Sequence, residues 1–209
     1  MNNLVTLNFI KDFDYIIAKN VNAFFHNSNG IWSDFLKFIT TLGNFGIIFI
    51  SIGMIMLLFI KTRKAGLVAL LGMLVGLILT NLILKNAVMR PRPFIDESSD
   101  YYLWWKEVGM LQENGYSFPS GHTTSSMAFG FSLFICLKKK YSWLFLILPL
   151  LMGFTRIYFM VHYFSDVLGG LVVGALASIS GYYIIKLLLK INCLKKAYDL
   201  PSIISLFKK

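Results

Sequence analysis

Two long stretches without a charged residue constrain this chain more than any other feature. Residues 38–60 and 65–84 contain no Asp, Glu, Lys or Arg. Because a helix rises about 1.5 Å per residue, each stretch is long enough to cross a hydrocarbon core of about 30 Å. The hydrophobic content of 56% also exceeds what a soluble protein of 209 residues needs. The chain is therefore predicted to be all-α, a polytopic membrane helix bundle.

Further apolar segments complete this bundle. They are residues 119–137, 141–156 and about 166–189. We expect one domain over residues 1–209, with a transmembrane core at 38–189 and a basic cytoplasmic tail at 190–209. Residues 1–37 mix apolar and charged side chains at nearly helical period, which favours an amphipathic interfacial helix. A span in that segment stays open, so the prediction is five or six transmembrane helices.

The net charge of +10 lies mostly at the ends of apolar segments. Lysines there suit lipid headgroups, so we expect no nucleic-acid partner. Basic groups follow the first, third and fifth spans, and the positive-inside rule assigns that face to the cytoplasm. Segments 85–93, 119–122 and 156–166 then meet at the extracytoplasmic surface of the plasma membrane. Cys136 and Cys193 are far apart, which indicates neither a disulfide framework nor a zinc site.

Polar residues in these three segments form a pattern suited to phosphate. Lys85, Arg92 and Arg156 are basic groups on the face where the positive-inside rule disfavours them. Guanidinium forks grip phosphate oxygens in pairs, whereas a lysine acts as a point charge. Ser120 and Gly121 stand at the start of a predicted helix, where unpaired backbone N–H groups and the helix dipole favour an anion. The segments therefore predict a phosphate site.

His162 and Asp166 are four residues apart, so in a helix the carboxylate can accept the second N–H of the imidazole. The other ring nitrogen can then attack phosphorus to form a phosphohistidine, which water hydrolyses. His122 is the candidate general acid. A satisfied polar pair and a metal site are the alternatives for these residues, but nearby cations repel a metal, so we expect no metal and no cofactor. Arg90 is interpreted only as an anchor of a helix end.

The three segments together resemble the signature of the type 2 phosphatidic-acid phosphatase family of integral-membrane lipid phosphatases. The matching positions, at the family's spacing, are Lys85 with Arg92-Pro93, Pro119 to His122, and Arg156 with His162 and Asp166, with Thr155 in place of the usual Ser. The resemblance implies a metal-independent phosphatase with His162 as nucleophile, Asp166 as its orienting partner and His122 as general acid. It implies phosphate binding by Lys85, Arg92, Ser120, Gly121 and Arg156. Family members usually have six spans, which leaves five or six open here.

An outward-facing site is where a spent polyprenyl diphosphate carrier appears, so the favoured substrate is undecaprenyl diphosphate, cleaved to undecaprenyl phosphate and phosphate. Phosphatidylglycerophosphate, phosphatidic acid and lipid A are the alternatives. Soluble vanadium haloperoxidases share the signature, but the membrane spans argue against that branch. A transporter or flippase for an anionic lipid would use the basic cluster only for binding; it does not need the paired histidine, and no internal repeat supports it. The expected partners are a lipid phosphate or diphosphate and membrane lipids.

Overall fold

The computed structural model of the protein describes residues 2–201, with side chains from residue 8 onward except those of Phe45 and Ala197. Within residues 2–201 the regular structure is helical and no strand occurs. The α-helices are α1 (Asn2–Asn27), α2 (Ser33–Leu42), α3 (Ile47–Leu57), α4 (Ile60–Leu77), α5 (Lys85–Val88), α6 (Asp100–Glu107), α7 (Gly121–Leu137), α8 (Ile147–Tyr158), α9 (Phe164–Leu188) and α10 (Asn192–Tyr198). Short 3-10 turns are η1 (Asn44–Gly46), η3 (Pro93–Ile95) and η4 (Ser142–Leu146), and η2 (Ile78–Leu84) is π-helical.

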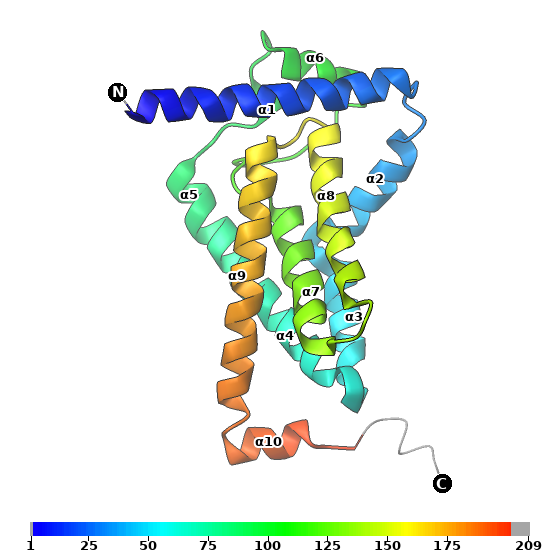
Figure 1. The fold of residues 1–209 in the computed structure, drawn as a ribbon, viewed down its shortest axis with the longest axis vertical. Helices are drawn as coiled ribbons and strands as arrows, with labels where there is room; N and C mark the ends of the chain where they lie inside the picture. The colour runs from blue at the N-terminus through cyan, green and yellow to red at the C-terminus, as the bar shows by residue number, and fades with distance from the viewer. Residues whose placement is uncertain (1, 202–209) are drawn as a thin grey trace.

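Helix α1 lies across one end of the bundle, over the ends of α8 and α9, whereas α4, α7, α8 and α9 run along its length (Figure 1). Aromatic pairs fasten α1 there. The Phe24 and Phe154 ring centroids are 6.0 Å apart, and those of Phe13 and Phe164 are 5.4 Å apart. This crosswise placement favours the interfacial interpretation of the N-terminal segment over a sixth span parallel to the others.

Long apolar helices are fewer than the predicted spans. Within residues 2–201, two are long and apolar enough to cross a membrane, the continuous helix Ile60–Val88 and α9. Helices α2 and α3 make a third candidate if the pair counts as one span, and they are bent by 52°. Segments 119–137 and 141–156 form the shorter helices α7 and α8. The number of five or six spans therefore stays a prediction.

The first predicted span, 38–60, is not one continuous helix. It begins earlier, at Ser33, and breaks at η1, where Gly46 has a left-handed φ of 65° that favours glycine. Gly43 precedes the break, and a Cβ there would lie 2.8 Å from Cδ2 of His122. The glycines permit a turn inside this apolar stretch, and the turn borders the site described below.

Glycines bring α4, α7 and α9 close together. A Cβ at Gly174 would lie 2.6 Å from the backbone oxygen of Thr124, and one at Gly76 would lie 3.0 Å from Cγ2 of the same residue. Side chains at Gly72 or Gly170 would likewise meet neighbouring backbone atoms. The spacing of small residues therefore serves close helix packing, as membrane helices require.

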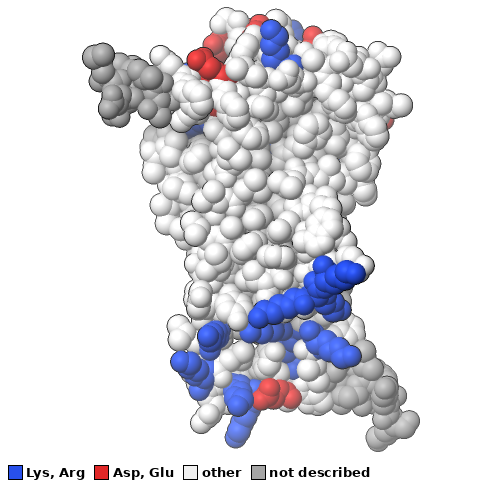
Figure 2. All heavy atoms as spheres, in the orientation of Figure 1, with Lys and Arg blue, Asp and Glu red and all other residues white. Residues whose placement is uncertain are grey.

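Charges gather at the two ends and leave the middle of the visible face uncharged (Figure 2). Lys and Arg surround the end that carries α10, whereas acidic and basic groups are mixed at the α1 end. Between the ends, α4 and α9 expose large apolar side chains such as Leu74, Val172 and Leu176. An apolar belt between two polar ends suits a lipid environment, and the protein is a membrane protein.

Candidate functional site

A cavity of about 500 Å³ lies at the end of the bundle crossed by α1. Predicted site residues line it from four elements: Lys85, Arg92, Gly121, His122 and His162. They come from α5, the loop that follows it, the start of α7 and the α8–α9 loop. The three sequence segments therefore converge on one cavity, as predicted.

His162 is buried, and both of its ring nitrogens have a partner. Nδ1 lies 3.3 Å from Oδ2 of Asp166, and Nε2 lies 3.2 Å from Nη1 of Arg92. A carboxylate can only accept and a guanidinium can only donate, so Nδ1 carries the hydrogen and Nε2 holds the lone pair. Burial, and then the charges of Arg92 and Arg156, hold the pKa of His162 well below its ordinary value. The imidazole is therefore neutral, and its Nε2 lone pair faces Arg92.

The contact between His162 and Asp166 has a different origin from the one predicted. His162 precedes α9, which begins at Phe164, so the two residues do not share a helix. Instead, the Asp166 carboxylate turns back to cap the helix and accepts the backbone N–H of Tyr163 at 2.9 Å. The same oxygen, Oδ2, faces the imidazole. A helix cap, rather than one helical turn, places the carboxylate beside the histidine.

Arg92 and Arg156 are both buried and both contact Glu113. Arg92 also donates to the backbone oxygen of Asn114 at 2.8 Å, and Arg156 donates to Thr40 Oγ1. Burial raises the pKa of Glu113, but Arg156 and the other nearby cations outweigh it and lower that pKa overall. Glu113 is therefore an ionised carboxylate held between two arginines predicted to bind phosphate.

Ser120 and Arg156 do not line the cavity, although both are predicted phosphate ligands. The Ser120 N–H is not unpaired, because it donates to the backbone oxygen of Asp166 at 3.0 Å. Its hydroxyl accepts a hydrogen bond from Thr123. The prediction of an outward-pointing Ser120 amide was wrong because this amide ties α7 to α9. Gly121, the next residue, does line the cavity.

His122 faces the cavity from the first turn of α7. Its Nε2 lies 3.0 Å from Oδ1 of Asn44, a residue of the break between α2 and α3. The two histidines therefore have different partners. His162 contacts a carboxylate and an arginine, whereas His122 contacts a side-chain amide. Lys85 is half-buried and lines the same cavity. Separate surroundings are compatible with separate roles for the two histidines.

Sequence reasoning missed several contacts of the site. Arg90 is not a mere helix-end anchor, since it donates to Oδ1 of Asp166 and to Oδ2 of Asp14, both at 2.7 Å. The one sequence feature that could have indicated a role for Arg90 was its positive charge on the face where the positive-inside rule disfavours basic residues. Asn44 and Glu113 gave none, because neither belongs to a motif and nothing local marks a partner distant in the sequence.

Comparison with known proteins gives the same picture. The chain is 29% identical over 160 residues to undecaprenyl-diphosphatase BcrC of Bacillus subtilis (strain 168), covering 77% of this chain and 78% of that protein. It is 38% identical over 93 residues to a lipid A 1-phosphatase of Rhizobium johnstonii, covering 44% and 37%. The crystal structure of a transmembrane PAP2 type phosphatidylglycerolphosphate phosphatase from Bacillus subtilis matches with a TM-score of 0.64 and 25% identity, covering 86% of this chain and 87% of that one.

The family assignment follows from these findings together with the geometry. The chain folds like the transmembrane phosphatase, and its cavity gathers residues from all three motif segments. The model of the PAP2 superfamily matches residues 65–189, which are more than half of the 209 residues. This chain therefore belongs to the PAP2 superfamily.

Proposed function

We propose that this protein is an integral-membrane lipid phosphatase that forms a phosphohistidine on His162 and acts best on a polyprenyl diphosphate, undecaprenyl diphosphate above all. The observation that carries the proposal is the pair of contacts on one imidazole. Asp166 accepts from Nδ1, and Nε2 is directed at Arg92 in the cavity wall. A neutral histidine with an oriented lone pair beside an arginine is suited to attack on phosphorus.

The reaction then proceeds in two steps, formation of the phosphohistidine and its hydrolysis. Nε2 of His162 bonds to the terminal phosphorus while the bond from phosphorus to the leaving oxygen breaks, and His122 gives that oxygen a proton. His122 next takes a proton from water, whose oxygen bonds to the phosphorus while the bond from phosphorus to Nε2 breaks, so that phosphate leaves and His162 regains its lone pair. Lys85, Arg92 and Gly121 bind the phosphoryl oxygens from the cavity wall. Arg156 acts from behind it, where it contacts Glu113, and Ser120 holds the start of α7.

The substrate preference rests on likeness and on the predicted side of the membrane. The match to the undecaprenyl-diphosphatase extends over 77% of this chain, against 44% for the lipid A 1-phosphatase. The structural match is to a phosphatidylglycerolphosphate phosphatase, which makes that lipid the main alternative. A polyprenyl diphosphate offers a phosphate leaving group and presents its head at the outer surface, where we place the site.

Phosphate release tests this proposal. Purified protein is incubated with undecaprenyl diphosphate, phosphatidylglycerophosphate, phosphatidic acid and lipid A in matched lipid mixtures. We expect the highest kcat/KM with undecaprenyl diphosphate, loss of release in His162→Ala, and an acid-labile phosphate trapped on His162 of the wild type. Release that survives in His162→Ala would overturn the mechanism. Binding of these lipids without release from any of them would favour the transporter.

We further propose that hydrolysis needs no metal. Among the described side chains of residues 2–201, no three or more His, Cys, Asp or Glu gather in a way that could hold a metal ion, whereas the positive charges of Arg92, Arg156 and Lys85 act on His162. Turnover should survive a strong chelator. Vanadate should compete with substrate because its trigonal-bipyramidal form resembles the phosphoryl-transfer transition state. Activity lost in the chelator and restored by one divalent ion would contradict this part of the proposal.

The final part of the proposal is that the site faces outward from the plasma membrane. The basic α10 end would lie in the cytoplasm and the cavity end outside, as the positive-inside rule requires. In a background without Cys136 and Cys193, Glu97→Cys should react with an impermeant thiol reagent in intact cells. Lys139→Cys should react only after the membrane is opened. The opposite pattern would place the cavity on the cytoplasmic side and remove the main reason for an outer-leaflet substrate.

A further inference from the structure

We propose that Arg90 and Asp14 form a positioning unit for the nucleophile, so that helix α1 helps to complete the catalytic site. Asp14 lies in α1, outside residues 65–189 that match the family. Neither residue belongs to the three motifs, and neither touches the reacting atoms. The inference rests on the proposed role of His162 and adds to it the residues that fix its carboxylate partner.

Arg90 contacts the oxygen of Asp166 that the imidazole does not use. Its Nη1 lies 2.7 Å from Oδ1 of Asp166 and 2.7 Å from Oγ of Ser165. The guanidinium carbon also stands 3.8 Å above the centre of the Tyr163 ring, which limits its movement. Oδ2 of Asp166 is thereby left to the Tyr163 N–H and to His162.

Asp14 fixes the other half of the guanidinium. Its Oδ2 accepts from Nη2 of Arg90 at 2.7 Å, and its Oδ1 accepts the backbone N–H of Ser165 at 2.7 Å. The hydroxyl of Ser165 also donates to Asp14, at 2.6 Å. Asp14 is 1% exposed, and among the described side chains its ion pair is with Arg90. One aspartate of α1 therefore clamps both Arg90 and the first turn of α9.

The electrostatic consequence concerns Asp166. Its side chain is fully buried, and within the described chain Arg90 is the only lysine or arginine in an ion pair with it. A buried carboxylate without a partner either takes up a proton or moves toward another cation, and both changes remove the acceptor that holds Nδ1–H of His162. Arg90 does not line the 500 Å³ cavity, so its loss should lower kcat and leave KM nearly unchanged.

The first measurement is steady-state kinetics in the full-length protein. Rates are expressed per vanadate-binding site, so that unfolded molecules do not count. We expect kcat to fall about tenfold to a hundredfold in Arg90→Gln, the range known for the outer partners of metal-binding histidines. Arg90→Lys keeps the charge but not the fork, so it should recover part of that loss. Asp14→Asn should lose about threefold to tenfold. Asp12→Asn, an exposed neighbour in α1, is the matched control and should equal the wild type.

The second measurement is a double-mutant cycle with Asp166→Asn. If Arg90 acts through Asp166, adding Arg90→Gln to Asp166→Asn should lower kcat by less than about twofold more. A merely structural role would give the full additional loss in both backgrounds. Per-site kcat in Arg90→Gln equal to wild type, or fully additive losses in the cycle, would overturn the inference. The two measurements require that the wild type releases phosphate and that His162→Ala does not. If this requirement fails, the proposed function fails, and the inference about Arg90 is judged separately.

Discussion

The two ends of the bundle use arginine in opposite ways. At the α10 end, the partners of Arg63 within residues 2–201 are backbone oxygens: it donates to Leu57 at 2.8 Å, to Leu200 at 2.7 Å and to Tyr198. At the cavity end, Arg90, Arg92 and Arg156 each form an ion pair with a carboxylate. The first arrangement ties the end of α10 and the residues after it to the end of α3, whereas the second sets the charge around the proposed nucleophile, His162.

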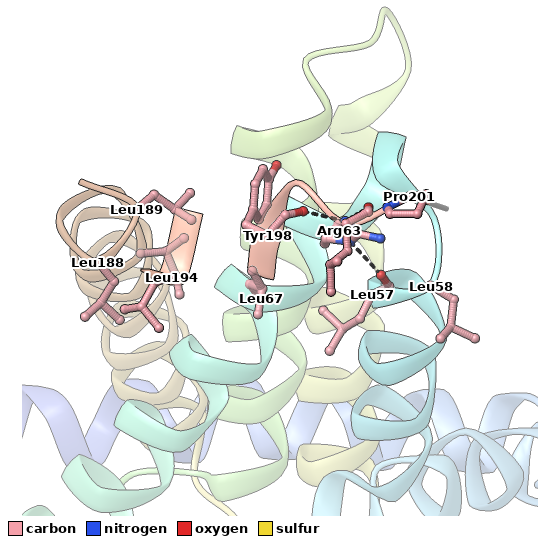
Figure 3. A pocket seen from close by; sticks show the side chains of 11 residues that line it. Leu57, Leu58, Arg63, Leu67, Leu188, Leu189, Leu194, Tyr198 and Pro201 are labelled. Carbon is pink, nitrogen blue, oxygen red and sulfur yellow. Dashed lines mark hydrogen bonds between the residues drawn. The ribbon is translucent and has the colours of Figure 1, made fainter. Parts of the chain in front are cut away.

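The cavity beside Arg63 and the cavity beside His162 are similar in size but differ in chemistry. Arg63 borders a cavity of about 540 Å³ that is otherwise lined mainly by leucines from α3, α4, α9 and α10 (Figure 3). The cavity of about 500 Å³ at the other end holds two histidines, a lysine, an arginine and a glutamate. Apolar walls alone can accommodate lipid chains, whereas reaction at phosphorus needs titratable groups with fixed partners.

The largest expected effect on kcat comes from replacing an aspartate at the cavity end, compared with an aspartate at the α10 end. Asp166→Asn should lower kcat about a thousandfold or more, because an amide can favour the wrong histidine tautomer, as in the serine-protease triad. Asp199→Asn, at the exposed α10 end, should leave kcat unchanged. Phosphate release per vanadate-binding site measures both. An Asp166→Asn enzyme within tenfold of wild type would show that the carboxylate does not govern His162.

An intermediate effect concerns the carboxylate between Arg92 and Arg156. Glu113→Gln should strengthen vanadate binding about tenfold, because it removes the negative charge that neutralises the two arginines expected to bind the anion. A tenfold change corresponds to about 1.4 kcal/mol. Inhibition constants for vanadate measure this change. Glu107→Gln is the control, because Glu107 bonds Asn22 and His26 away from the cavity. Unchanged or weaker inhibition in Glu113→Gln would mean that the carboxylate organises the arginines rather than competing with the anion.

The smallest effect comes from the α10 end. Arg63→Gln should lower the free energy of unfolding by about 1–3 kcal/mol, because it removes charged hydrogen bonds to carbonyl oxygens. Per-site kcat should stay at the wild-type value. Thermal unfolding in detergent and phosphate release measure the two quantities. A fall in per-site kcat without a fall in stability would contradict the division of labour between the two ends.

Local pattern accounts for what could be predicted of the site. Three short segments, Lys85 to Pro93, Pro119 to His122 and Arg156 to Asp166, could be read from local spacing, and each contributes at least one residue to the cavity. The contact of His162 with Asp166 spans four residues and was predicted, although a helix cap produces it. The predictions were wrong where a group that is unpaired by local rules bonds to a residue far away in the sequence. The Ser120 amide looked unpaired, for example, because nothing near it in sequence reveals the Asp166 carbonyl.

The sequence by itself determined the helical membrane class, because long uncharged stretches must satisfy their backbone polar groups internally, and helices do so within one segment. It also determined the family signature and predicted the contact between His162 and Asp166. Only the tertiary structure decided what surrounds them. Asp14 meets Ser165 across 151 positions, Arg156 meets Thr40 across 116, and His122 meets Asn44 across 78. Hydrogen bonds act over about 3 Å, and such partners become neighbours only when packed helices close the long loops between them.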